Sequence, residues 1–127
     1  MLKKFFCAAF ILATIVFGNV EVSAQDFWVN TENGIEYYVM DETFNNQTQY
    51  RNNRQFTVDV KLVRNQKADI KTFSFRENDG MIFHSIDGNE RDFVHKGTAA
   101  YSIWEFGLKY LGIDYEVKYD WPARGEV

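Results

Sequence analysis

The clearest pattern along the chain is a strict alternation of apolar and polar residues between positions 56 and 62. Four apolar residues are separated by three polar ones: Phe56, Val58, Val60 and Leu62 alternate with Thr57, Asp59 and Lys61. Successive side chains of a β-strand point to opposite faces of the sheet. The pattern therefore predicts a strand with one buried face and one solvent face.

Further segments rich in β-branched and aromatic residues lie between clusters of turn residues, which is typical of strands. They are Phe27 to Asn30, Ile35 to Met40, Asp69 to Glu77, Met81 to Ile86 and Arg91 to His95. The first two join at Glu32-Asn33-Gly34, which predicts an N-terminal hairpin. Arg64 to Ala68 turns the chain between two later strands. Asp41 to Asn53 is polar with little periodicity, which predicts a long loop with one helical turn around Glu42 to Asn45.

The turn at Asn78-Asp79-Gly80 leaves the register of the next strand open. A three-residue loop places Phe75 opposite Phe83, whereas a two-residue loop places Phe75 opposite His84. A shift of one residue exchanges the two faces of the whole strand. The sequence alone does not choose between them.

From Thr98 onward the apolar period becomes that of a helix. One stripe holds Ala100, Ile103, Trp104, Gly107, Leu108 and Leu111. Thr98 is the expected N-cap and Gly112 the expected C-terminal stop. We expect this face to pack on the sheet near Val58, Val60 and Phe73, with Trp104 buried and Gly107 permitting close approach of the helix backbone. From Asp114 to Trp121, aromatic and apolar residues again alternate with polar ones. This segment is expected to form either a further strand or an aromatic arm.

These patterns predict an α+β fold with an antiparallel sheet of about six strands and one C-terminal amphipathic helix packed on one face. The N-terminus has a different pattern: Lys3 and Lys4 precede an apolar run from Phe5 to Phe17, and Val22-Ser23-Ala24 follows. Basic residues, a short apolar run and small residues in this order indicate a secretory signal peptide. We therefore expect residues 1–24 to be a signal peptide and residues 25–127 to form a single domain.

Loss of residues 1–24 would change the formal net charge from −4 to −5 and remove Cys7, the sole cysteine. An acidic domain with scattered cations lacks the positive field that attracts nucleic acid, so we expect no nucleic-acid partner. The apolar run is shorter than the roughly 20 residues that a membrane-spanning helix needs. We expect a secreted or envelope protein with no membrane span in its mature form, no disulfide and no cofactor.

Two segments resemble the surface-adhesin protein E family of small bacterial envelope proteins. Ile35 to Phe44, IEYYVMDETF, is similar to that family's paired-tyrosine strand, and Thr98 to Gly112, TAAYSIWEFGLKYLG, is similar to its closing helix. The resemblance implies a sheet of about six strands with the helix packed on it, and a role in binding host or matrix components. The family's cysteine pair and lipidation site have no counterpart in this chain.

Aromatic residues are 17% of the chain, enough to fill a small core and still leave rings for recognition. Tyr37 and Tyr38 are adjacent, so in a strand one ring faces the core and the other faces out. Candidate ligand-binding residues are Tyr37, Tyr38, Tyr50, Tyr115, Tyr119 and Trp121.

Catalytic candidates are few, and no catalytic residues are predicted. His84 and His95 are weak candidates for metal binding. If His84 lay opposite Phe93, the two imidazoles would be diagonal neighbours on one face, although structural zinc usually takes four protein ligands.

The leading prediction is a non-catalytic, adhesin-like binding module of the bacterial cell envelope or extracellular space. It would use the helix-free sheet face, or the Asp41 to Asn53 loop, against a protein or glycan. The alternatives are a self-associating structural envelope protein, which would form homo-oligomers, and a small metal-dependent enzyme that uses His84 and His95.

Overall fold

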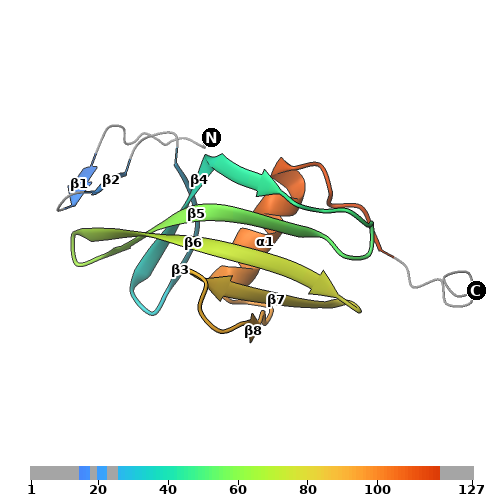
Figure 1. Ribbon diagram of the computed structural model, residues 1–127. Coiled ribbons are helices and arrows are strands. Elements are labelled where there is room, and N and C mark those ends of the chain that lie inside the picture. Colours follow the sequence, from blue (N-terminus) through green and yellow to red (C-terminus); the bar gives the residue numbers. More distant parts are fainter. Residues whose placement is uncertain (1–14, 18–19, 23–25, 118–127) are drawn as a thin grey trace, which may run out of the picture.

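The computed structural model describes residues 15–17, 20–22 and 26–117 of the chain. Its main elements are β3 (Phe27–Glu32), β4 (Ile35–Asn46), β5 (Gln55–Arg64), β6 (Lys67–Asn78), β7 (Met81–Ile86), β8 (Asp92–Phe93) and α1 (Ala99–Tyr110). In the described part, the strands form one six-stranded antiparallel sheet in which sequential strands are neighbours, and α1 crosses one face (Figure 1). The predicted α+β fold is confirmed.

A small separate hairpin precedes this sheet. β1 (Ile15–Phe17) pairs antiparallel with β2 (Val20–Val22), and β2 contacts β6. Both strands fall within the segment predicted to be a signal peptide, and the remainder of that segment lies outside the described residues. Among the described residues, no helix has both the length and the apolar character needed to cross a bilayer.

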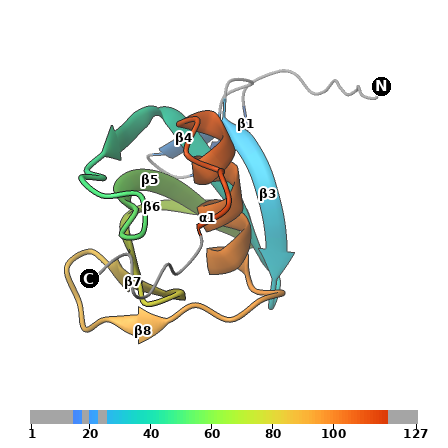
Figure 2. The same ribbon diagram turned by 90° about the vertical axis from the view of Figure 1, so that its right-hand side faces the viewer.

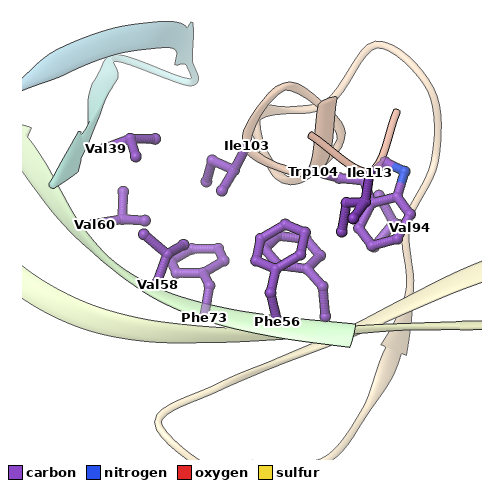
Figure 3. Close-up of a cluster of buried hydrophobic side chains, with 10 residues drawn as sticks. Val39, Phe56, Val58, Val60, Phe73, Val94, Ile103, Trp104 and Ile113 are labelled. Atoms are coloured by element: carbon purple, nitrogen blue, oxygen red, sulfur yellow. The ribbon is translucent and has the colours of Figure 1, made fainter. Parts of the chain in front are cut away.

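The sheet curls around α1, so that β3 lies on one side of the helix and β7 and β8 lie below it (Figure 2). Apolar side chains from the concave face of the sheet point toward the helix (Figure 3). Ile103 and Trp104 are 0% and 2% exposed, and they pack on the side chains of Phe56, Val58 and Phe73. Full burial of each large apolar side chain stabilises the fold by roughly 1.5–3 kcal/mol. The predicted helix face and the burial of Trp104 are confirmed.

Both ends of α1 are where the sequence places them. The Thr98 hydroxyl accepts a hydrogen bond from the Tyr101 backbone N–H at 3.2 Å, which satisfies one of the free N–H groups of the first turn. At the other end Gly112 has φ +72°, and the Ile113 N–H donates to the Leu108 carbonyl at 2.8 Å. This is a Schellman ending, in which a glycine adopts the left-handed conformation at low cost.

Gly107 lies against the side chain of Phe56. A Cβ built on Gly107 would lie closest to Phe56 Cζ and 2.6 Å from Phe56 Cε1, inside van der Waals contact. The helix therefore approaches the sheet as closely as the ring allows. This confirms the predicted role of Gly107.

The prediction of a loop from Asp41 to Asn53, with a helical turn around Glu42 to Asn45, is wrong in its first half. β4 continues to Asn46, with a shift in register against β5 between Met40 and Asn45. At this irregularity the Thr43 hydroxyl donates to the Met40 carbonyl at 2.7 Å and accepts from the Asp59 N–H at 2.8 Å. A side chain thus replaces the missing ladder bonds, so a polar segment remains a strand.

The turns between strands are tighter than the sequence suggested. Asn65 and Gln66, with φ +51° and +64°, form a two-residue turn where a turn from Arg64 to Ala68 was predicted. Asp79 and Gly80 also have positive φ, and Asn78 pairs with Met81. Two-residue turns of this kind match the twist of the strands they join.

The second of these turns decides the open register in favour of the two-residue loop. Phe75 lies opposite His84, so the side chains of Ile82, His84 and Ile86 share the concave face with Phe73 and Phe75. The alternative, with Phe75 opposite Phe83, is wrong.

One position on the predicted solvent face of β5 is buried. The side chain of Lys61 is 9% exposed, and its Nζ lies 2.7 Å from Oδ2 of Asp26, which is equally buried. Asp26 immediately precedes β3, and β2 contacts the neighbouring strand β6. The chain before β3 therefore covers part of the convex face, which alternation alone does not predict.

The last predicted strand is shorter than expected, since β8 covers only Asp92–Phe93 of the predicted Arg91 to His95. Val94 is buried at 4% exposure, and the chain then turns toward α1. After α1, residues 114–117 form no strand, although the Tyr115 side chain packs against the core.

Candidate functional site

A hollow of about 120 Å³ lies on the convex, helix-free face of the sheet. Its lining residues are mainly polar: Gln47, Gln55, Ser74, Arg76, Ser85 and Arg91, together with Phe75 and Phe83. It is at the end of the sheet where the loop after β4 returns to β5. The leading prediction from the sequence named this face, or the Asp41 to Asn53 loop, as the binding surface.

The strand register places these side chains in rows. Gln55, Arg76, Phe83 and Phe93 occupy directly opposed positions across β5, β6, β7 and β8. Ser74 and Ser85 form the adjacent pair on the same face. Directly opposed residues have Cβ atoms about 4.5–5.5 Å apart. A ligand on this face would therefore meet a guanidinium and an aromatic ring side by side.

The side chains of Arg76 and Arg91 make no hydrogen bond, ion pair or ring contact within the part of the chain that the structure describes. Three other cations at the sheet are paired with carboxylates: Arg54 with Glu77, Lys61 with Asp26, and Lys71 with Asp69 and Asp87. The whole chain carries a formal net charge of −4. The hollow therefore places two unneutralised guanidinium groups on an acidic protein.

A second pocket of about 220 Å³ lies on the concave side, near the start of α1. It is lined by Glu32, Tyr37, Phe73, His84, Ile86, Phe93, Val94, His95, Thr98 and Ala100. The Glu32 carboxylate accepts a hydrogen bond from the Ala99 N–H at 2.9 Å, which favours the start of the helix. Burial, reinforced by the negative charge of Glu32, raises the pKa of Tyr37 above its usual value of 10.0.

Both candidate histidines line this second pocket, but not in the predicted arrangement. His84 lies opposite Asp92 and not opposite Phe93, so the register that would have made the two imidazoles diagonal neighbours is not the one formed. His84 Nδ1 is 3.3 Å from the Asp92 carbonyl, and the ring stacks near Phe73 and Phe75 with centroids 6.0 Å away. His95 instead meets the Phe93 ring edge-on at 4.6 Å.

A metal needs several convergent ligands, and the described residues contain no group of three or more histidine, cysteine or acidic side chains placed to hold one. The second pocket therefore provides imidazole, phenol and carboxylate groups without a metal-binding geometry among those residues. Within this pocket, the His84 ring is hydrogen-bonded to the Asp92 backbone carbonyl, and the Glu32 carboxylate accepts a hydrogen bond from the Ala99 backbone N–H.

The six aromatic candidates do not gather at one place. Tyr37 packs on the concave side, whereas Tyr38 lies opposite Trp28 and donates a hydrogen bond to Glu36 at 3.0 Å. The alternation of the adjacent tyrosines is confirmed.

The other candidates are spread over the rest of the chain. Tyr50 is 66% exposed on the loop after β4. Tyr115 lies under the guanidinium of Arg51, whose Cζ is 3.7 Å from the ring centroid. Tyr119 and Trp121 lie outside the described residues.

A different aromatic cluster was missed. Phe27, Phe44, Phe106 and Tyr110 form a chain of ring contacts with centroids 4.9–6.2 Å apart. Phe27 and Tyr110 remain 44% and 50% exposed. The spacing of Phe106 and Tyr110, four residues apart on one helix face, was a usable signal. Phe27 on β3 and Phe44 on β4 meet these two rings only because α1 packs against both strands.

The residues of the convex hollow were also missed, because they are ordinary polar positions when taken one at a time. A comparison of the chain with protein-family models, a search of curated proteins and a search of solved structures each gave no match.

Proposed function

We propose that this chain is an exported, non-catalytic, adhesin-like binding module of the bacterial cell envelope or extracellular space. Its ligand, a protein or a glycan, lies in the convex hollow around Arg76, Phe83 and Arg91. The observation that carries the proposal is the pair of unneutralised arginines beside an aromatic ring on the helix-free face. Arginine and aromatic residues contribute disproportionately to binding free energy at protein surfaces.

Two features of the sequence support the setting. The order of basic residues, apolar run and Val22-Ser23-Ala24 is that of a secretory signal peptide. The segments Ile35 to Phe44 and Thr98 to Gly112 resemble the surface-adhesin protein E family. Export and adhesion belong together, since an adhesin acts outside the cytoplasm.

Export has a direct test. Intact-mass analysis of the protein recovered outside the cytoplasm of a bacterial host should show a chain that begins near Gln25. Recovery of the protein with Met1 still attached contradicts the proposed export.

Binding at the convex hollow is tested with the protein purified after export, probed on arrays of extracellular matrix proteins and of glycans. Ser85→Trp fills the hollow with a ring whatever the ligand is, and should abolish the binding that the wild type shows. Ile70→Trp is the matched control. It adds the same ring to the same convex face of the sheet, but on β6 and away from the hollow. Equal binding by both variants, or no binding by the wild type to any probe, contradicts the proposal.

Self-association is the second candidate function. The exposed rings of Phe27 and Tyr110 favour it, because apolar rings left in water stabilise contacts between copies. Light scattering over a range of concentrations separates the two functions. A molar mass that rises with concentration, and returns to that of a monomer in Phe27→Ser, supports self-association.

A further inference from the structure

We infer that the convex hollow recognises an acidic saccharide, a sugar that carries a carboxylate or a sulfate ester. This rests on the proposed function and narrows its ligand class. The first argument is charge. Arg76 and Arg91 both line the hollow and neither has an anionic partner within the described chain. A guanidinium presents donors in a planar fork that matches carboxylate and related oxyanions.

The second argument is the chemistry of the other lining groups. Ser74 and Ser85 supply hydroxyls, and Gln47 and Gln55 supply amides. Each of these groups both donates and accepts hydrogen bonds. Sugar hydroxyls also both donate and accept hydrogen bonds, so the lining groups of the hollow can accept from them or donate to them. The flat ring of Phe83, directly opposite Arg76, offers an apolar surface for the C–H face of a pyranose.

The third argument separates a saccharide from an extended peptide. The hollow lies over β5, β6 and β7, which are interior strands with neighbours on both sides. Their backbone N–H and C=O groups are used in the sheet, so a peptide cannot add here as another strand. Recognition must come from side chains. The floor also offers no apolar cavity for a large peptide side chain, because six of its eight lining residues are polar.

A nucleic acid is a poor fit on charge. Proteins that bind nucleic acids commonly contact about 6–10 phosphates. This hollow holds two cationic residues on a chain of net charge −4. The number of cations suits one or two acidic groups on an otherwise neutral ligand.

The size of the hollow sets the scale of the ligand. At about 120 Å³ it is smaller than the roughly 300–1,000 Å³ typical of sites that enclose a drug-sized molecule. The ligand therefore lies across the convex face and seats one acidic sugar residue in the hollow. The flanking Arg54–Glu77 pair fixes the start of β5 against the end of β6, which preorganises Gln55 and Arg76.

The experiment compares saccharides of matched length that differ in their acidic groups, by calorimetry or interferometry, with the protein purified after export. The pairs are sialyllactose with fucosyllactose, a hyaluronan oligosaccharide with a chitin oligosaccharide of the same length, and a heparin oligosaccharide with its desulfated form, which keeps its carboxylates and lacks the sulfates. At least one member with the additional acidic groups should bind about tenfold or more tighter than its counterpart, the size expected for a charge-assisted hydrogen bond. The first two pairs report on carboxylate and the third on sulfate.

Arg76→Gln should weaken that binding about tenfold or more, and Arg76→Lys should restore only part of it because the ammonium lacks the planar fork. Lys67→Gln is the matched control. It removes one exposed positive charge at the opposite end of the same strand and should leave affinity unchanged. The affinity should also fall as ionic strength rises past about 0.15 M. Unchanged circular dichroism shows that each variant is folded.

The outcomes separate this inference from the proposed function. Equal binding of acidic and neutral sugars, still blocked by Ser85→Trp, overturns the acidic ligand and keeps the binding site. Tighter binding of an oligoglutamate peptide than of every saccharide overturns the sugar class. Equal loss of affinity in Arg76→Gln and Lys67→Gln shows a general charge effect and overturns recognition by the hollow.

Discussion

Arg54 and Glu77 form a buried, two-pronged ion pair: Nε and Nη2 of the arginine lie 2.8 and 2.9 Å from the two carboxylate oxygens. Both side chains are less than a tenth exposed. The remaining guanidinium nitrogen, Nη1, donates to the carbonyls of Ile113 and Tyr115 at 2.6 and 3.0 Å. One side chain therefore ties the start of β5, the end of β6 and the segment after α1 together.

Removing one partner of this pair should be severely destabilising. In Arg54→Met the Glu77 carboxylate stays buried without its counter-charge, and we expect a loss of about 3–5 kcal/mol in the free energy of unfolding. Urea denaturation measures it. The double variant Arg54→Met, Glu77→Met should lose less, because no charge is left buried. Arg51→Met, which removes an exposed contact with Tyr115, should cost no more than about 1 kcal/mol. A loss below 1 kcal/mol in Arg54→Met contradicts the assignment.

Gly107→Ala should destabilise the protein although alanine is the better helix former. The new Cβ would collide with Phe56, which is fully buried and stacks on Trp104 at 5.4 Å, so the ring has no room to move. We expect a net loss of about 1–3 kcal/mol, against an intrinsic helix gain of about 1 kcal/mol.

A double-mutant cycle tests the cause of that loss. In a Phe56→Leu background the same glycine change should cost clearly less, because the collision is relieved. Glu105→Ala, on the exposed face of α1, should change the free energy of unfolding by no more than about 0.5 kcal/mol. Equal costs of Gly107→Ala in both backgrounds would show that the ring is not the obstacle.

The two tight hairpins allow a stabilising change. Gln66 adopts φ +64° in the turn between β5 and β6, a conformation that costs most residues about 1–2 kcal/mol. Gln66→Gly should therefore stabilise the protein by about 0.5–1 kcal/mol, measured by urea denaturation. The reciprocal change Gly80→Gln, at φ +80° in the turn between β6 and β7, should destabilise it. Loss of stability in Gln66→Gly would contradict the turn geometry.

Tyr38 should make stability fall in strong alkali. Burial, with a hydrogen bond to Glu36 and the charge of that carboxylate, raises the pKa of Tyr38 from 10.0 to about 12. The folded state thus favours the neutral phenol. Its contribution is complete below the unfolded pKa of 10 and is lost as pH rises through the folded pKa. Absorbance of the phenolate during an alkaline titration measures the pKa.

Glu36→Gln provides the control for Tyr38. It removes the negative charge but keeps the burial, so the pKa should fall without reaching that of a free tyrosine. Tyr38→Phe should remove this component of the titration. Titration of Tyr38 at its ordinary pKa in the wild type would show that the ring is solvated.

Most elements could be predicted because their signals come from residues that are close together in the sequence. The alternation at Phe56 to Leu62 and the stripe through Ile103 and Trp104 each describe one face of one element, and each is read from neighbouring residues. The caps Thr98 and Gly112 also act within one turn. The strand from Asp41 to Asn46 escaped prediction, because its stabilising partner is the Asp59 N–H on another strand.

The sequence by itself determined the α+β fold, the approximate positions of most sheet strands and of α1, and the helix face that is buried, because these follow from periodicity and local conformational preference. The tertiary structure alone decided which side chains meet across strands. Phe75 met His84 through a two-residue turn, Lys61 was buried by Asp26, and Arg76 came beside Phe83. A one-residue change of register between β6 and β7 would exchange the partners of Phe75 and Arg76 while leaving each strand's own pattern intact.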